Sequence, residues 1–378
     1  MYKKLSALVL MIILLAGTVW IISGGIFHIL SGRDFNESFS ENIQFTSGWN
    51  AADTMVDDML PFYDRTLWLR TKLTLATGSR KIGDVYINKE RLIREPAVLD
   101  ESSLIETAEY INSFYLKYSI PTCMTAFPEA AEIYVECLPE NVTVPSQLEQ
   151  LDKFYENVDT KIRTVNSYHV LSTFKEDYIY YRTDSRCTAN GAYFVYRSLI
   201  RKMGYYPVPY DHWTISHMKN DVNGDLYDVC LYDSVTPDIL DVYTCENSSE
   251  IVSVRNFNGN EWSEGAFYND SVLGYGSIES YYIGKPCLLT EIETNVENGK
   301  NLLVFKDSYG DNMLPFFTQH YAKIDVIDIS CLDRNISEFV EPSDYQQVLI
   351  LCDADTFTHS NAFKFLVGNA VKDGERND

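Results

Sequence analysis

The stretch NLLVFKDSYGDNMLPFFTQHYAKIDVIDIS, residues 301–330, decides the expected fold. Residues 301–305 read as an almost wholly apolar strand, residues 311–321 as a helix, and residues 323–330 as a second apolar strand. A third strand of this kind, QVLILC, lies at 347–352. Apolar strands that alternate with helices are typical of a parallel sheet covered on both faces. The sequence therefore predicts an α/β fold, an αβα sandwich with a parallel sheet of about five strands.

The same alternation begins further upstream, near residue 101. Apolar residues recur with helical spacing after residue 103, and the buried strand SIPTCMTAF follows at 119–127. The remaining expected elements are a helix at 146–162, a short strand at 162–171, a helix at 188–203 and a helix at 335–345. Residues 205–295 have short aromatic and β-branched runs without a helical stripe, so they are predicted to be a β-rich insertion in a domain of residues 101–378.

The N-terminal part is expected to be organised differently. Lys3 and Lys4 precede an uncharged apolar run from Leu5 to Leu30, long enough to cross a hydrocarbon core of ~30 Å. Residues 1–30 are therefore predicted to be a transmembrane anchor with a cytoplasmic N-terminus, and a cleaved signal peptide is the alternative. Residues 31–100 are expected to form a polar stalk, a helix that stops near Gly78, and a hairpin around Asn88–Glu90. The expected location is the cell membrane, with a single span and an extracytoplasmic C-terminal domain.

Composition narrows the classes of partner. The chain has 31 basic and 54 acidic side chains and a formal net charge of -23, which disfavours nucleic-acid binding. The eight cysteines permit disulfides in an exported domain, or are buried free thiols, and none has the C-x-x-C spacing of a structural zinc site. No metal and no cofactor are expected.

Residues that could carry chemistry lie at the predicted carboxyl ends of the parallel strands, where such folds place their active sites. One segment is KDSYG, 306–310, in which Ser308 would expose its hydroxyl at a strand-to-helix turn or would simply cap the helix. A second segment holds Asp184, Arg186 and Cys187 before the helix at 188–203. A third, CDADTFTHS, holds Asp355 and His359 after the last strand.

These segments resemble the DHHW family. The chain reads EDYIYYRTDSRCTANGAYFVY where the family signature is DEYIYYRTDHHWTSLGAYYAY, and residues 302–330 resemble the serine block of that family closely. AEIYVECLPENVTV, LILCDADTF and DVYINKERLIRE resemble three further family segments, so the likeness covers about residues 55–365 in a consistent order. NGDLYD in the insertion is similar to a drifted form of the family's GTLYS. The resemblance implies an SGNH-hydrolase-like fold and a relation to the extracytoplasmic proteins of alginate O-acetylation, in which an Asp-x-His pair and a later serine act on acyl esters of exported glycans.

Carried over position by position, the resemblance makes Ser308 the nucleophile and Asp184 the acid of the triad. Arg186 then stands in the histidine position and Cys187 in the tryptophan position. A serine hydroxyl needs a nearby base, and a guanidinium with a pKa above about 12 cannot be that base. Arg186 either forms a salt bridge with Asp184 or a neighbouring acid, or offers a bidentate site for an anionic ligand.

Another histidine would be needed to restore the triad. His359 is the best placed, because it follows the last strand, although a surface loop histidine is the alternative. Tyr181, Asp307 and Tyr309 flank the site and are candidates for ligand contact; the tyrosines either stack on sugar rings or belong to a tyrosine-rich core.

The function expected is that of a membrane-anchored, degenerate DHHW protein that binds a cell-envelope glycan or an envelope assembly partner without ester turnover. The alternative is an active carbohydrate esterase or O-acetyltransferase that uses Ser308 and Asp184 with His359 as a relocated base. A purely structural surface protein is a third reading.

Overall fold

The computed structural model describes residues 63–140, 142, 145–245, 249–275, 278 and 280–368. The chain divides into two units, Met1–Ser79 and Arg80–Asp378. In the first unit, the structure describes the helix α4, Tyr63–Ala76, and the residues that follow it. The helix ends before Gly78, as predicted, and Gly78 has a positive φ of 88°. The predicted anchor at 1–30 lies outside the described residues. Among the residues that are described, no helix has the length and apolar character needed to span a bilayer.

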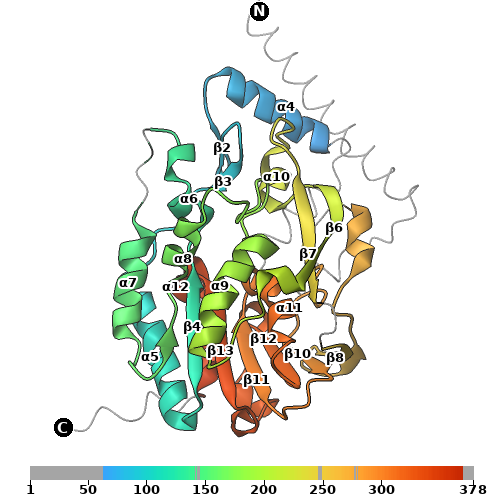
Figure 1. Ribbon diagram of the computed structural model, residues 1–378. Helices are drawn as coiled ribbons and strands as arrows, with labels where there is room; N and C mark the ends of the chain where they lie inside the picture. Colours follow the sequence, from blue (N-terminus) through green and yellow to red (C-terminus); the bar gives the residue numbers. More distant parts are fainter. Residues whose placement is uncertain are drawn as a thin grey trace, which may run out of the picture. The chain divides into compact units, whose positions relative to one another are not determined.

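The second unit is built on a sheet with eight described strands (Figure 1). In spatial order they are β5 (Arg163–Thr164), β4 (Thr122–Phe127), β13 (Gln347–Asp353), β11 (Asn301–Lys306), β12 (Lys323–Asp328), β10 (Leu289–Thr294), β8 (Ile251–Phe257) and β9 (Trp262–Glu264). The first five strands are parallel, and the last three are antiparallel to their neighbours. The predicted five-stranded parallel sheet is therefore confirmed.

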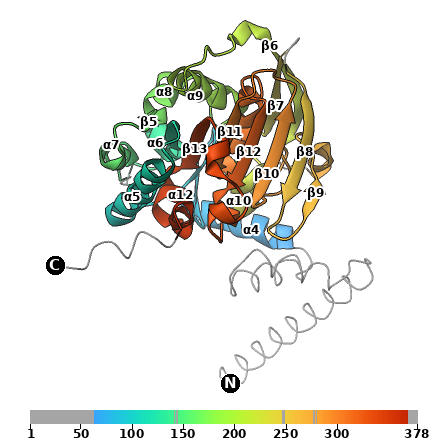
Figure 2. The same ribbon diagram turned by 90° about the horizontal axis from the view of Figure 1, so that it is seen from below.

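Helices cover both faces of this sheet. Successive side chains of each strand point to opposite sides, so the apolar strands have apolar side chains to bury on both faces. In β11, Leu303 and Phe305 pack into one core, whereas Leu302 and Val304 pack into the other. The first core is closed by α5 (Glu101–Tyr118), α7 (Gln147–Asn157) and α12 (Ala354–His359). The second core is closed by α6 (Ala130–Ile133), α8 (Ser167–Thr173), α9 (Ala189–Lys202) and α11 (Leu314–Phe317). Figure 2 shows α5, α7 and α12 on one side of β13, and α8 and α9 on the other.

The predicted insertion at 205–295 is rich in β-structure but is not separate from the sheet. Its first part is a two-stranded antiparallel ribbon of β6 (Trp213–Val222) and β7 (Asp238–Cys245), with the short helix α10 (Asp225–Cys230) between them in sequence. Its second part, β8 to β10, extends the parallel sheet in antiparallel fashion, with Thr290 opposite Val326 of β12.

A small three-stranded antiparallel sheet precedes the sandwich. It consists of β1 (Lys81–Ile82), β2 (Val85–Ile87) and β3 (Leu92–Arg94). The predicted hairpin is confirmed, since Ile87 pairs with Leu92. The backbone N–H of Leu92 donates to the Arg182 carbonyl at 2.7 Å, so this sheet is joined to the segment that carries Asp184.

Three sequence expectations about local structure are wrong. The expected helix at 311–321 is a 3-10 turn, η4 (Ser308–Met313), followed by the single helical turn α11. The expected helix at 335–345 is two 3-10 turns, η6 (Ile336–Glu338) and η7 (Pro342–Asp344). The expected strand at 162–171 is the two-residue β5 followed by α8, whose start is fixed because the Asn166 side chain accepts from the N–H of Tyr168. The other 3-10 turns are η1 (Val135–Cys137), η2 (Tyr210–His212), η3 (Asp270–Tyr275), η5 (Ile329–Cys331) and η8 (Asn361–Leu366).

Candidate functional site

The candidate site lies at the carboxyl edge of the parallel sheet, where β4, β11 and β13 end together. The segments after β11 and β13 are hydrogen-bonded to each other, because the N–H of Asp353 donates to Asp307 Oδ2 at 2.7 Å. Asp307 also caps the following turn by accepting from the N–H of Tyr309 at 2.9 Å. The Asp307 carboxyl is therefore held by the backbone at the centre of this edge.

Ser308 follows Asp307 and begins η4, which has only six residues. Its side chain is exposed, and in the part of the chain that the structure describes its hydroxyl has no hydrogen-bond partner. The hydroxyl is thus accessible, but no general base contacts it here.

Asp184 and Arg186 form a buried, bidentate ion pair in the loop before α9. Arg186 Nε donates to Asp184 Oδ1 and Arg186 Nη2 donates to Asp184 Oδ2, both at 2.7 Å, and the backbone N–H of Arg186 adds a bond of 3.0 Å. Only 1% of Asp184 and 9% of Arg186 is exposed to solvent. Burial by itself would raise the pKa of Asp184, but the charge and hydrogen bonds of Arg186 hold that pKa below its ordinary value. The carboxylate that the sequence resemblance predicts to orient a histidine is therefore occupied by the guanidinium of Arg186.

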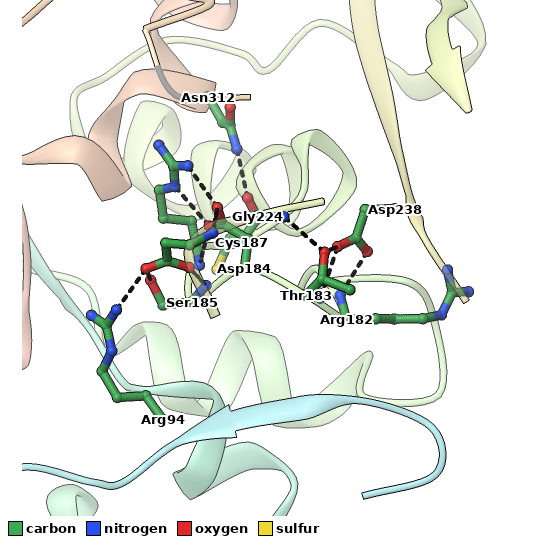
Figure 3. A network of polar contacts seen from close by, with 11 residues as sticks. Arg94, Arg182, Thr183, Asp184, Ser185, Cys187, Gly224, Asp238 and Asn312 are labelled. Carbon is green, nitrogen blue, oxygen red and sulfur yellow. Dashed lines mark hydrogen bonds and ion pairs between the residues drawn. The ribbon is translucent and has the colours of Figure 1, made fainter. Parts of the chain in front are cut away.

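The loop around this pair is fixed from several elements (Figure 3). Asp225, the first residue of α10, accepts from the N–H and the hydroxyl of Ser185, both at 2.9 Å, and pairs with Arg94 of β3 at 2.6 Å. Asn312 Nδ2 of η4 donates to the Cys187 carbonyl at 2.5 Å. The position of Arg186 is therefore set by the three-stranded sheet, the insertion and the serine segment together.

Gly224 allows α10 to approach the pair closely. A Cβ built at this residue would lie 2.3 Å from the Cβ of Asp184, which no side chain tolerates. The N–H of Gly224 donates to the Thr183 hydroxyl at 3.0 Å, and the Asp238 carboxylate accepts from the N–H of Thr183 at 2.8 Å. Glycine is needed here for space rather than for its backbone freedom.

A second buried charge cluster lies beneath Ser308. Lys306, the last residue of β11, is 2% exposed and contacts Asp311 of η4 and Asp328 of β12, each at 2.6 Å. Burial would lower the pKa of Lys306, but the two carboxylates raise it above its ordinary value. The lysine therefore joins the serine turn to the neighbouring strand as a permanent cation.

The histidines that the structure describes lie outside the Ser308 turn η4. His359 is at the end of α12, where its Nδ1 contacts Asp355 Oδ1 at 2.7 Å and 59% of its side chain is exposed. His320 is buried against the Tyr196 hydroxyl at 2.7 Å, and burial lowers its pKa to about 4. His169, His212 and His217 lie on α8, η2 and β6. Within the described ranges, no histidine hydrogen-bonds Ser308 or Asp184.

The aromatic candidates are located inside the fold. Tyr181 is 1% exposed and belongs to the core under α9, so its ring has no free face for a sugar. Tyr309 is also buried and packs against Phe127 of β4 at a centroid distance of 6.2 Å. These two tyrosines therefore belong to the core beneath the site and do not lie on its surface.

Several residues of the site were not predicted as functional. They are Arg94, Glu129, Gly224, Asp225 and Asn312. Gly224 and Asp225 lie in NGDLYD, the segment that resembles the family's GTLYS, so that likeness was the available signal. Arg94 and Asn312 also lie in segments that resemble the family, but their partners are distant in sequence, so nothing indicated these contacts.

Glu129 is a buried carboxyl that follows β4 in this edge. Its oxygens accept from the N–H of Ala97 at 3.2 and 3.4 Å. Burial and the nearby charge of Asp353 raise its pKa to about 8. Glu129 is therefore largely protonated at neutral pH in the folded chain.

This raised pKa gives a testable pH dependence. Between the unfolded pKa, about 4.3, and about 8 the folded chain binds a proton that the unfolded chain has lost, so stability must fall as pH rises. We expect the Glu129→Gln variant to lack this contribution, so that the wild type loses up to about 1.4 kcal/mol of unfolding free energy per pH unit more than the variant. Urea unfolding at pH 5, 6, 7 and 8 measures the difference, and parallel pH profiles would contradict it.

Among the described residues, no three His, Cys, Asp or Glu side chains are grouped so as to hold a metal ion. The eight cysteines are free thiols in the structure. The serine hydroxyl, the carboxyls and the paired cations are the chemical groups described at this edge.

The DHHW protein family model matches residues 119–327, more than half of the chain. The chain belongs to the DHHW family. The matched range includes β4, the Asp184–Cys187 loop, the insertion and the Ser308 turn. The degenerate signature therefore lies inside the family domain rather than beside it.

Solved structures agree with this assignment at the level of the fold. A DHHW family protein from Eubacterium siraeum has a TM-score of 0.61 at 21% sequence identity, covering 75% of this chain and 97% of that one. PatB1 of Bacillus cereus, solved with a sulfonyl adduct, has a TM-score of 0.64 at 15% identity and covers 74% of this chain and 97% of that one. The comparison with curated proteins gave no match. The DHHW protein described here thus has the SGNH-hydrolase-like αβα fold that its sequence predicts.

Proposed function

We propose that this DHHW protein is a degenerate SGNH-type hydrolase that binds a cell-envelope glycan or an envelope assembly partner without turning over esters. The observation that carries the proposal is the buried, bidentate Asp184–Arg186 pair. A triad needs an imidazole between its carboxylate and its serine. Here the guanidinium of Arg186 binds the Asp184 carboxylate, and Arg186 stands where the resemblance expects the histidine.

The loss of the base affects the rate of the chemical step directly. The proton of the Ser308 hydroxyl has no acceptor in the described structure, and Arg186 cannot accept it because its pKa lies above about 12. The members of such a triad act as a unit, so the loss of the base removes most of the rate enhancement. The hydroxyl is accessible and the fold is intact, so ligand binding is the activity that we assign to the site.

Charge balance at the site favours an uncharged, hydroxyl-rich ligand. Arg186 is matched by Asp184, Arg94 by Asp225, and Lys306 by Asp311 and Asp328. No unbalanced cation is left among these groups to attract a carboxylate or phosphate. The neighbouring carboxyls of Asp307 and Glu129 offer hydrogen bonds of the kind that sugar hydroxyls use.

The location of the protein is part of the same proposal. The apolar run from Leu5 to Leu30, preceded by two lysines, favours a single membrane span with the DHHW domain outside the cytoplasm. In that location, the domain would be in contact with the glycans of the cell envelope.

Hydrolysis of 4-nitrophenyl acetate by the full-length protein tests the proposal. We expect equal, background-level rates for the wild type and the Ser308→Ala variant, because the serine lacks a base. The Arg186→His variant is the informative third arm, since it restores an Asp-x-His pair beside an otherwise retained site. A wild-type rate at least about 100-fold above that of Ser308→Ala, the size of a typical general-base contribution, would overturn the proposal.

The Asp355–His359 pair favours a second candidate function, an esterase or O-acetyltransferase with a relocated base. It sets a carboxylate behind an imidazole at the end of β13, as a triad would require, although Nε2 of His359 contacts no serine. This candidate predicts serine-dependent turnover that also disappears in the His359→Ala variant. Serine-dependent turnover that survives His359→Ala would exclude it.

A further inference from the structure

Basic side chains outnumber acidic ones in two stretches of this acidic chain, residues 63–94 and residues 161–202. Residues 161–202 contain eight Lys and Arg and only three Asp and Glu, although acidic residues outnumber basic ones in the whole chain. Four of these cations lie together on the surface and are called here the α9 basic patch: Arg163, Arg197, Arg201 and Lys202. Arg163, Arg201 and Lys202 are exposed, and Arg197 is half-buried.

The four residues are brought together by the end of α9 and the edge strand β5 (Figure 2). Arg163 Nη1 donates to the carbonyl of Lys202 at 2.6 Å, which joins the two elements. Arg197 and Arg201 are one helical turn apart, and the guanidinium of Arg197 lies 5.8 Å from the centre of the Tyr193 ring.

The patch is not neutralised by acids. Within the described residues, none of the four cations forms an ion pair, in contrast to Lys306, Arg94 and Arg186. Asp211 is the acid that faces the same ring, Tyr193. A helix C-terminus favours Arg201 and Lys202 through its dipole, but Arg197 lies a turn earlier and Arg163 is on another element. Helix stability therefore does not account for the whole cluster.

Exposed tyrosines lie beside the cations. Gly204 takes a φ of 93° and reverses the chain, so that the N–H of Tyr205 donates to the Ile200 carbonyl and the N–H of Val208 to the Tyr196 hydroxyl. The segment after Gly204 thus runs back along α9. It presents Tyr206, which is 93% exposed, and Tyr210, which packs against Tyr193 at 5.3 Å and is 48% exposed.

This surface is separate from the site at Ser308 and Arg186. α9 starts after Cys187, beside the site, and its 14 residues place Lys202 ~20 Å further along the helix axis. The charges differ as well, because every cation named at the site is paired whereas those of the patch are not.

We infer that the α9 basic patch, with Tyr206 and Tyr210, binds an anionic polysaccharide, a chain that carries carboxylate or phosphate groups. Guanidinium groups bind such anions bidentately, and aromatic rings beside them offer faces on which sugar rings stack. Because the chain as a whole is strongly negative, four cations in one place, without an ion pair among the described residues, give a polyanion a local point of attraction. The inference goes beyond the proposed function and does not depend on the state of Ser308.

Binding of polygalacturonate to the full-length protein in detergent tests the inference, with neutral dextran as the comparison. We expect stronger retardation in affinity gels with polygalacturonate than with dextran, and weaker retardation by polygalacturonate as salt is raised from 50 to about 300 mM. The Arg197→Ser/Arg201→Ser/Lys202→Ser variant should bind at least about tenfold more weakly, and Tyr206→Ser a few-fold more weakly. The matched control, Lys89→Ser/Lys153→Ser/Lys364→Ser, removes the same charge from exposed positions elsewhere and should bind like the wild type.

Three results would overturn the inference. The first is equal retardation by dextran and polygalacturonate, and the second is equal weakening in the patch and control variants. The third is binding to vesicles of 30% phosphatidylglycerol in phosphatidylcholine without binding to polygalacturonate, which would assign the patch to a membrane surface. Far-UV circular dichroism of each variant ensures that lost binding is not lost folding. The proposed function is tested by the esterase rates of the wild type and Ser308→Ala, which do not enter this experiment, so failure here is distinguishable from failure of the proposed function.

Discussion

Replacement of Arg186 by methionine is expected to lower the free energy of unfolding by about 3 to 5 kcal/mol. The substitution leaves the Asp184 carboxylate buried, 1% exposed, without the cation that donates two hydrogen bonds of 2.7 Å to it. A buried charge without a partner costs more than the pair itself contributes. Urea unfolding at pH 7, followed by tryptophan fluorescence, measures the loss.

The double variant Asp184→Asn/Arg186→Met separates the ion pair from simple packing. It removes both charges and keeps one oxygen, which can accept from the N–H of residue 186 as Asp184 Oδ1 does, while the amide nitrogen replaces Oδ2, the acceptor of the longer 3.3 Å bond from the N–H of Asp225. We expect it to recover most of the loss, to within about 1.5 kcal/mol of the wild type. Arg182→Met is the matched control, because Arg182 is partly exposed over the Tyr178 ring and should cost about 1 kcal/mol or less. A double variant no more stable than Arg186→Met would contradict this account of the pair.

Lys306→Met is expected to cost a similar 3 to 5 kcal/mol, about the penalty of breaking a buried ion pair. It would leave the Asp311 and Asp328 carboxylates buried near each other, with no cation between them. Burial already raises the pKa of Asp311 above its ordinary value, and without the lysine this carboxyl would take up a proton more readily, so the penalty should be smaller at pH 5 than at pH 8.

Lys323→Met provides the comparison for this prediction. Lys323 also contacts two carboxylates, Glu291 and Asp325, each at 2.9 Å, but 29% of its side chain is exposed. Water can therefore stabilise the two carboxylates in part when the lysine is removed, and we expect a loss of about 1 to 2 kcal/mol in the free energy of unfolding. Equal losses in the two lysine variants would show that burial does not determine the effect.

The fold could be predicted because its strands are written in the sequence as short apolar runs. LLVF, DVID and VLILC become β11, β12 and β13, each with side chains in both cores. The segments that were wrongly predicted to be helices lack such a signal. The segment from Leu314 to Phe317 is buried on all sides, so it has no amphipathic period, and Pro315 is at the start of its single helical turn.

The site could be predicted only where its parts are close in sequence or match the family. Asp184 and Arg186 are two residues apart, and their pairing was one of two readings of that spacing. Asp225 and Arg94 complete the same network from 40 or more residues away, and although both lie in segments that resemble the family, neither segment indicates that they contact this loop. The tyrosines show the opposite case, because their abundance near the motif reflects core packing under α9.

Reaction of the full-length protein with phenylmethanesulfonyl fluoride, followed by intact-mass spectrometry, tests the central claim most directly. An activated serine hydroxyl displaces fluoride and gains a sulfonyl group, and activation requires a base within hydrogen-bond reach. With Arg186 in place of the imidazole, the account predicts an unchanged mass for the wild type, as for Ser308→Ala. Stoichiometric addition of one sulfonyl group at Ser308, absent from Ser308→Ala, would contradict it.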